Sequence, residues 1–182
     1  MPRFYTTTGD DGLTGQLGEG RVAKYSPRLE AVGEIDEAAA ALGLARSLCK
    51  SERSAALLLQ VQRDLYGMMA EVSATPENAA RFRTINAGRV AWLGEQADAL
   101  SELVELPGEF IVAGDSPSGA AIDLARTIVR RAERRVALLL HEAEIENEEL
   151  MRYLNRLSSL CFVIELFEIQ ASGKSTPTLA KE

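Results

Sequence analysis

The chain has 182 residues, of which 46% are hydrophobic and 26% charged, and its formal net charge is -7. This length and apolar content suffice for one sizeable core, so we expect residues 1–182 to form a single domain. An acidic chain lacks the broad basic surface that non-specific binding to nucleic acid or anionic membranes needs, so we expect neither partner.

The cysteines and the lengths of the apolar runs indicate the cellular compartment of the protein. Cys49 and Cys161 both lie within helical patterns, which favours buried free thiols in a reducing compartment over a disulfide framework. No apolar run approaches the roughly 18 residues of a membrane span, and the start of the sequence has no apolar signal segment. The sequence therefore predicts a cytoplasmic protein.

The first 26 residues are rich in Gly, Thr and Asp and show no sustained hydrophobic period. This composition predicts an ordered loop or a disordered arm outside the core. Hydroxyl groups, glycines and Lys24 would suit an anion, although such an arm is a weak signal by itself and no Walker A loop is present.

Two helical patterns follow the arm. The first covers about 27–49 and starts with Ser26 as a cap and Pro27 at the first helical position. The second covers about 52–74 and stops before Pro76.

Three more helical patterns complete the chain. One starts near Thr84 and runs to about 105, and the next starts with Ser116 and Pro117 and runs to about 142. The last lies in "ENEELMRYLNRLSSLCFVIELFEIQAS". Five helices and no convincing strand predict an all-α bundle over residues 27–171, followed by a C-terminal tail over 172–182.

The segment "ELPGEFIVAGDSPSG" is the longest break inside the predicted bundle. It carries Phe110, Ile111 and Val112 together, and exposed loops rarely hold three large apolar residues in a row. We expect this loop either to cover a site or to be tucked over the core.

The stretch "RTIVRRAERR", residues 126–135, concentrates five arginines in an acidic chain. Helical geometry places Arg126, Arg130 and Arg134 on one face, where only Glu133 relieves their mutual repulsion. A solvated face with salt bridges is the simpler interpretation. The alternative is an anion site, since guanidinium groups donate paired hydrogen bonds to phosphate oxygens.

The chain resembles the PduO-type ATP:cob(I)alamin adenosyltransferases, also called corrinoid adenosyltransferases. The similar stretches are "YTTTGDDGLTG", "GEGRVAKYSPRLEAVGEIDE", "FIVAGDSPSGAAIDLARTIVRRAERR" and "LMRYLNRLSSLCFV". The resemblance implies a five-helix bundle with an ordered N-terminal nucleotide-binding arm, and a homotrimer with sites between subunits. It also implies transfer of the 5′-deoxyadenosyl group of ATP to the cobalt of cob(I)alamin, which leaves triphosphate.

The resemblance also assigns roles to individual residues. It makes Asp36 and Arg126 an interface ion pair, Arg130 a catalytic group, and Phe110 the aromatic side chain that closes the lower face of cobalamin and displaces its axial base. Mg²⁺ would arrive with ATP, with Glu133 as a candidate ligand. The residues implied for ATP binding are Thr6, Thr7, Thr8, Gly9, Thr14, Gly15, Lys24, Arg130, Arg131, Glu133, Arg134 and Asn155.

The chain departs from the family pattern at Thr7, Asp11, Ala113, Asp115 and Asp123, all in the implied site region. Asp11 and the absence of a basic residue at position 7 lower the positive potential beside the triphosphate. The family further implies two partner proteins, a corrinoid reductase and a cobalamin-dependent acceptor enzyme. Alternatives from other classes are a non-catalytic nucleotide or corrinoid carrier of the same fold and a helical adaptor.

Overall fold

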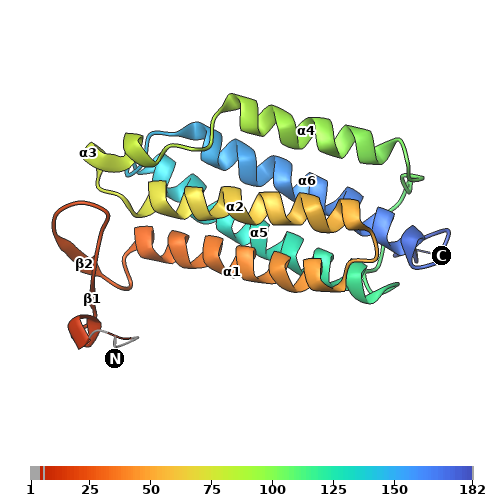
Figure 1. Ribbon diagram of the computed structural model, residues 1–182, viewed down its shortest axis with the longest axis horizontal. Helices are drawn as coiled ribbons and strands as arrows, with labels where there is room; N and C mark the ends of the chain where they lie inside the picture. Colours follow the sequence, from red (N-terminus) through yellow and green to blue (C-terminus); the bar gives the residue numbers. More distant parts are fainter. Residues whose placement is uncertain (1–4, 6, 182) are drawn as a thin grey trace.

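The computed structural model describes Tyr5 and residues 7–181, and most of these residues are helical (Figure 1). In chain order the elements are η1 (Thr7–Gly9), β1 (Leu13–Gly15), β2 (Arg21–Ala23), α1 (Pro27–Leu48), α2 (Glu52–Ser73), α3 (Pro76–Ala79), η2 (Ala80–Phe82), α4 (Ala87–Ser101), α5 (Pro117–His141) and α6 (Glu148–Ala171).

The two Ser-Pro helix starts are confirmed by their capping bonds. The hydroxyl of Ser26 accepts a hydrogen bond from the backbone N–H of Leu29 at 3.4 Å, and that of Ser116 accepts one from Gly119 at 3.0 Å. A serine oxygen at this position satisfies an N–H group that the first helical turn leaves without a partner. The cap and the following proline therefore fix where α1 and α5 begin.

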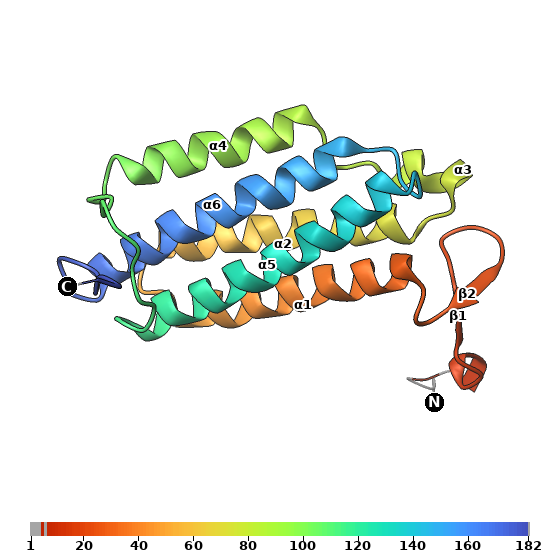
Figure 2. The ribbon, with the colours of Figure 1, turned by 180° about the vertical axis from the view of Figure 1, so that it is seen from behind.

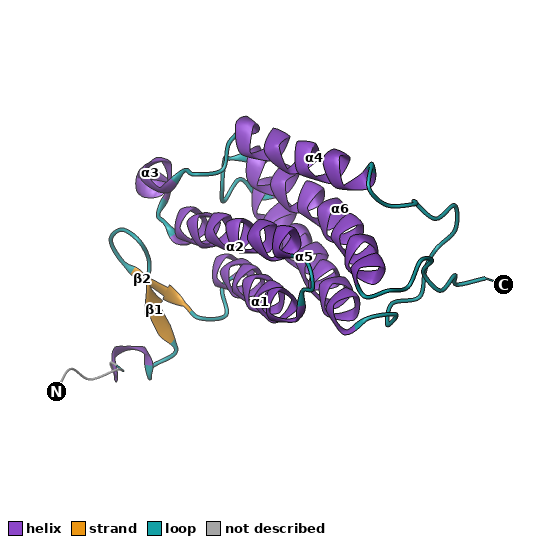
Figure 3. Ribbon diagram, turned by 45° about the vertical axis from the view of Figure 1, so that its right-hand side comes forward, coloured by secondary structure: helices purple, strands orange, loops and turns teal. Residues whose placement is uncertain are grey.

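Four long helices, α1, α2, α5 and α6, form the main body, and α4 covers α6 from outside (Figures 1 and 2). Helix α1 packs on both α2 and α5, and α5 packs on α6. Figure 3 shows α4 beside α6 and away from α1. Each of the long helices buries an apolar stripe in one shared core, as the helical periodicity of the sequence predicts.

Three sequence predictions about local structure are wrong. The described chain contains a short antiparallel sheet, in which Leu13 pairs with Ala23, where no strand was expected. It contains a sixth α-helix, α3, one turn long, so the expected count of five does not hold. The helix predicted to reach 105 ends at Ser101, because the chain turns there instead of continuing its pattern.

The arm is attached to the body through Leu17, in the turn between β1 and β2. Its N–H donates to the carbonyl of Ser73 and its carbonyl accepts from the N–H of Thr75, both at 3.2 Å. The next residue, Gly18, has a φ of +149°, and a Cβ there would lie 2.5 Å from the hydroxyl oxygen of Thr75. Glycine is required at this close approach.

The two ends of the bundle carry different segments. The arm with β1 and β2 projects beyond the end where α1 begins, whereas the α4–α5 loop and the C-terminus lie at the opposite end (Figures 1 and 2). Helix α5 runs from the second end toward the first. Within the described residues, no helix has the length and apolar character that crossing a bilayer requires.

Candidate functional site

The arginines of α5 differ in their partners. Arg126 binds Asp123 one turn earlier, with its Nε 2.8 Å and its Nη2 2.6 Å from one carboxylate oxygen. Arg134 donates to the backbone carbonyl of Arg130 at 2.9 Å. The side chain of Arg130 is exposed and has no hydrogen bond or ion pair to any other described residue. All donors of the Arg130 guanidinium are therefore available for an anion, and Arg134 uses only one of its own.

Arg131 lies on the side of α5 that faces α1. Its guanidinium forms ion pairs with Glu34 and Glu37, and these two contacts raise its pKa. The repulsion among the arginines is thus relieved by Asp123 and by two carboxylates of α1. Glu133 forms no ion pair with any described residue, and its carboxylate accepts a hydrogen bond from the amide of Asn155 at 2.9 Å.

Asp36 does not contact Arg126 within the chain. It is exposed on α1 and has no ion pair with any described residue, while Arg126 is paired with Asp123. The expected pair between Asp36 and Arg126 was an interface pair, so it stays a prediction about two subunits.

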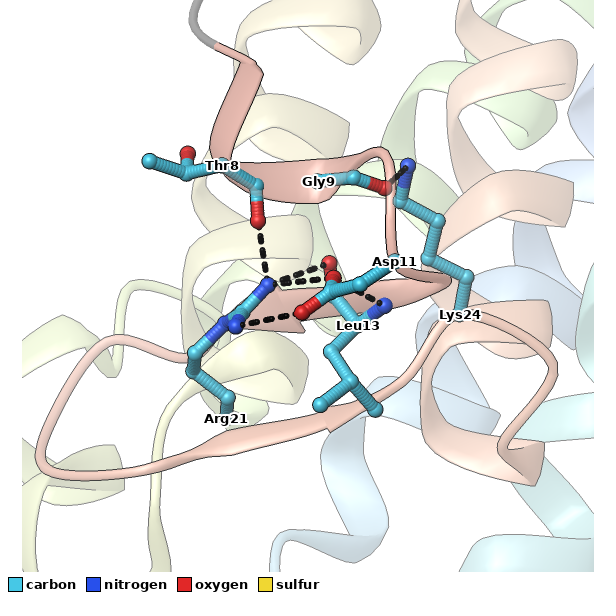
Figure 4. A network of polar contacts seen from close by, with 6 residues as sticks. All are labelled: Thr8, Gly9, Asp11, Leu13, Arg21 and Lys24. Carbon is cyan, nitrogen blue, oxygen red and sulfur yellow. Dashed lines mark hydrogen bonds and ion pairs between the residues drawn. The ribbon is translucent and has the colours of Figure 1, made fainter.

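The arm is organised by Arg21, as Figure 4 shows. Its guanidinium donates to both carboxylate oxygens of Asp11, at 2.9 and 2.7 Å, and also to the backbone carbonyls of Thr8 and Leu13. The hydrogen bond from Arg21 lowers the pKa of Asp11 and keeps its carboxylate ionised. Lys24 donates to the carbonyl of Gly9 at 2.7 Å (Figure 4).

The other arm residues implied for ATP surround this network. Thr7 and Thr8 are exposed in η1, Thr14 is half-buried in β1, and Gly15 pairs with Arg21 across the sheet. Thr6 lies outside the described residues. The structure brings the described members together at one end of the bundle, although no sequence pattern indicates that Arg21 joins them.

A cavity of about 560 Å³ lies beside the α4–α5 loop. Phe110 and Arg126 line this cavity, and Phe110 is 85% exposed. The remaining lining residues are Pro107, Gly108, Glu109, Ile111 and Ala113 of the loop, Asp123 of α5 and Phe162 of α6. The apolar loop therefore borders a hollow and is not tucked over the core.

A second hollow, of about 470 Å³, continues along α5 and α6. Arg126 and Phe162 line both hollows, and Arg130 lines the second together with Ser158 and Ser159. Phe110 and the unpaired Arg130 thus line two neighbouring hollows that share Arg126 and Phe162. Sequence spacing could not show this, because Phe110 belongs to a loop and Phe162 to another helix.

One buried carboxyl group interacts with Asp123 and Arg126, the charged α5 residues that line the first hollow. Glu165 of α6 is 1% exposed, both of its carboxylate oxygens lack a hydrogen-bond partner, and its side chain lies against the first turn of α5 at Gly119. Burial, reinforced by the charge of Asp123, raises the pKa of Glu165 to about 7. No sequence pattern marks Glu165 as unusual, since it occupies an ordinary helical position.

Comparison with known proteins adds an independent observation. Residues 4–168 match the profile of the family described as cobalamin adenosyltransferase. The chain belongs to this family.

Individual relatives agree with the assignment to the cobalamin adenosyltransferase family. The chain is 38% identical to a cobalamin adenosyltransferase of Cupriavidus metallidurans, over 96% of this chain and 92% of the relative. It is 35% identical to the corrinoid adenosyltransferase PduO of Salmonella typhimurium over 88% of this chain, and it spans about half, 48%, of that relative's length. The PduO of Citrobacter freundii is likewise matched over 48% of its length.

The fold agrees with solved structures as well. A variant of the PduO-type ATP:corrinoid adenosyltransferase of Lactobacillus reuteri, complexed with cobalamin and ATP, superimposes with a TM-score of 0.91 at 27% identity. The match covers 99% of this chain and 100% of that one. A second variant of the same enzyme, complexed with ATP, gives a TM-score of 0.89 over 98% of this chain.

Proposed function

We propose that this cobalamin adenosyltransferase-family protein transfers the 5′-deoxyadenosyl group of ATP to the cobalt of cob(I)alamin. In this reaction the Co(I) centre of the substrate attacks C5′, a cobalt–carbon bond forms, and the C5′–oxygen bond breaks. The bonding electron pair leaves with triphosphate. No general base is needed, so the protein's work is to orient two substrates and to stabilise a polyanionic leaving group.

The observation that carries this proposal is the pair of neighbouring hollows, one lined by Phe110 and the other by the unpaired Arg130, that share Arg126. An exposed aromatic ring beside a cavity suits the face of a corrin. A guanidinium without a carboxylate partner suits phosphate oxygens, because its donors are already free. Arg126, which lines both hollows, would stand between the two substrates.

We place the ATP site between subunits. The arm, with Thr7, Thr8, Gly9 and Lys24, lies at the opposite end of the bundle from the Phe110 loop (Figure 1). One chain therefore separates the two halves of the proposed site, and an arm from a neighbouring subunit would reunite them. The Lys24 ammonium would exchange its bond to the carbonyl of Gly9 for triphosphate oxygens.

A homotrimer is the assembly that we propose. The exposed stripe of α1 consists of Asp36, Ala40, Leu44 and Leu48, spaced at four residues, and Leu44 is 55% exposed. Apolar residues repeated along one exposed face are typical of a surface that another protein covers. Asp36 belongs to the same stripe, so that covering would bring it against a neighbouring subunit, where Arg126 is the proposed partner.

Mg²⁺ would be held mainly by the triphosphate. At nucleotide sites this ion commonly takes one or two protein carboxylates together with phosphate oxygens and water. Glu133 offers a carboxylate next to Arg130 and Arg134 on α5, and Asn155 holds it in place. When bound, Mg²⁺ neutralises charge on the triphosphate, and Glu133 and Asn155 would orient it.

An anaerobic assay with MgATP and chemically generated cob(I)alamin tests the proposal. We expect the absorption spectrum of adenosylcobalamin to appear together with one triphosphate for each product molecule. Tight binding of ATP and cobalamin without product would instead identify a carrier and refute the enzyme. No rise of the unfolding temperature with either substrate would point to an adaptor.

A further inference from the structure

The C-terminal tail pairs with the loop that carries Phe110. The N–H of Val112 donates to the carbonyl of Thr178 at 2.8 Å, and the N–H of Ala180 donates to the carbonyl of Phe110 at 2.7 Å. Ile111 and Leu179 form an antiparallel bridge between these two bonds. The backbone on either side of Phe110 is therefore held as one strand of a short two-stranded pair.

Asp115, at the end of the same loop, binds the tail through its side chain. One of its carboxylate oxygens accepts the N–H of Thr178 at 2.6 Å, and the other accepts the Thr178 hydroxyl at 2.8 Å. The ammonium group of Lys174 forms an ion pair with this second oxygen and also donates to the Thr178 hydroxyl at 2.9 Å. We call Asp115, Lys174 and Thr178 the tail clasp.

The loop has no comparable support from the bundle. Among the described residues, every hydrogen bond and ion pair of residues 105–115 is made with the tail. Phe110 itself is 85% exposed, so its ring is not anchored by packing. The side chain of Asp115, by contrast, is only 10% exposed, whereas that of its partner Lys174 is 42% exposed. The position of Phe110 beside its cavity thus depends on the tail.

We propose that Asp115 is a positioning residue for the adenosylation reaction, and that the tail clasp sets the position from which Phe110 meets the lower face of cobalamin. This inference rests on the proposed function. A ring that must displace an axial base has to be held in place before the substrate arrives, because a mobile loop would lose conformational entropy on binding. A carboxylate that receives three hydrogen bonds from one short segment provides such support.

The Asp115→Asn variant tests the clasp, because the amide cannot accept all three donors. Its first measurement uses the full chain without substrates: hydrogen exchange at the amides of Val112 and Ala180. We expect exchange at both amides to accelerate about tenfold, the factor that corresponds to one lost charge-assisted hydrogen bond. The unfolding temperature should stay close to that of the wild type, since the clasp lies outside the core.

The second measurement follows cob(II)alamin bound in the presence of MgATP. Its absorption and electron paramagnetic resonance spectra distinguish cobalt with and without an axial base. We expect Asp115→Asn to lower the base-free fraction severalfold and to slow adenosylation that starts from cob(II)alamin by about tenfold. The dissociation constant for ATP should change less than about twofold, because the clasp is not part of the nucleotide site.

Variants of the tail supply the controls. Thr178→Val removes one hydroxyl and should reproduce part of the effect, whereas Thr178→Ser should restore wild-type behaviour. Lys174→Met should weaken the clasp, but Lys181→Met, a lysine of the same tail with no partner among the described residues, should not.

The outcomes separate this inference from the proposed function. Unchanged amide exchange in Asp115→Asn would overturn the clasp whether or not the protein is an enzyme. Faster exchange with a wild-type base-free fraction and a wild-type rate would overturn the positioning role. A wild-type protein that makes no adenosylcobalamin would refute the proposed function, and faster exchange in the variant would still support the clasp as the support of the loop.

Discussion

The guanidinium of Arg21 holds the carboxylate of Asp11 with paired hydrogen bonds of 2.9 and 2.7 Å (Figure 4). Asp11 alone would place negative charge beside the proposed triphosphate site. The pair with Arg21 neutralises that charge, and the same guanidinium fixes the backbone of the arm through the carbonyl of Leu13 at 3.2 Å. The ion pair between Arg21 and Asp11 therefore stabilises the conformation of the arm.

Arg21→Met should therefore weaken ATP binding without unfolding the bundle. We expect the dissociation constant for MgATP to rise about tenfold, because the arm loses its charge-assisted bonds. The unfolding temperature should hardly move, since the strands of the arm pack mainly on each other. Calorimetric titration and a thermal melt measure the two quantities.

Arg53→Met is the matched control, because Arg53 is exposed on α2 and its side chain has no partner among the described residues. It should bind ATP as the wild type does. A wild-type ATP affinity in Arg21→Met would exclude an ATP-binding role for this network.

Arg130→Ala should impair the use of ATP more than it affects the fold. Removing one preorganised cation from a polyanionic leaving group costs about 100-fold in rate in comparable cases, and we expect kcat/KM for ATP to fall by that order. The fold should persist, because the Arg130 side chain bonds to no other described residue. Steady-state assays and size-exclusion chromatography check both expectations.

Arg135→Ala on the same helix is the control. The side chain of Arg135 is 44% exposed, and its only ion pair among the described residues is a 4.0 Å contact with Glu30. Its activity should stay within about twofold of the wild type. Near-normal activity of Arg130→Ala would contradict the assignment of Arg130 to the triphosphate.

The sequence predicted the long helices well because their signals are local. Ser26 and Ser116 are each followed by proline, and they cap α1 and α5. Apolar periodicity indicates the buried faces of these helices. The sheet of the arm was not predicted, because its strands, Leu13–Gly15 and Arg21–Ala23, are only three residues long and their pairing depends on an intervening turn. Residues 76–79 form a helix too short for its pattern to stand out.

The site was predictable in its residue types and not in its contacts. The arginines of α5 stood out by composition, but the carboxylates that bind Arg131 come from Glu34 and Glu37, more than 90 positions earlier in the chain. The clasp between Asp115 and Thr178 likewise joins residues 63 positions apart. Such pairs form only where distant segments of the folded chain meet, so no local pattern contains them.

Glu168→Gln should destabilise the fold. Glu168 of α6 is fully buried, and its carboxylate accepts the N–H groups of Lys50 and Ser51, at 2.7 and 3.1 Å, at the start of α2. A glutamine has one acceptor oxygen, so one of these part-buried N–H groups would lose its partner, and the free energy of unfolding should fall by about 1–3 kcal/mol. Urea denaturation measures the change.

Glu52→Gln, at an exposed position of the same helix start, should change the free energy of unfolding by less than about 0.5 kcal/mol. If both variants were equally stable, the buried carboxylate would not be needed to cap α2.

Glu165→Gln should alter how stability depends on pH. In the folded chain the pKa of Glu165 is raised from 4.5 to about 7, so the folded state binds a proton more tightly than the unfolded state does. The wild type therefore has its full stability from this group below pH 4.5 and loses it as the pH rises to about 7. A shift of this size corresponds to a loss on the order of 3 kcal/mol.

Glutamine does not ionise, so the variant should lack this loss. We expect the two proteins to have similar free energies of unfolding near pH 5 and the variant to be the more stable near pH 8. Asp115, Asp123 and Arg126, the charged groups that act on Glu165, are present in both proteins, so their own titration largely cancels in the difference. Urea titrations at the two pH values give that difference directly. Parallel pH profiles would mean that Glu165 ionises in the folded chain as readily as in water, which its burial without a hydrogen-bond partner argues against.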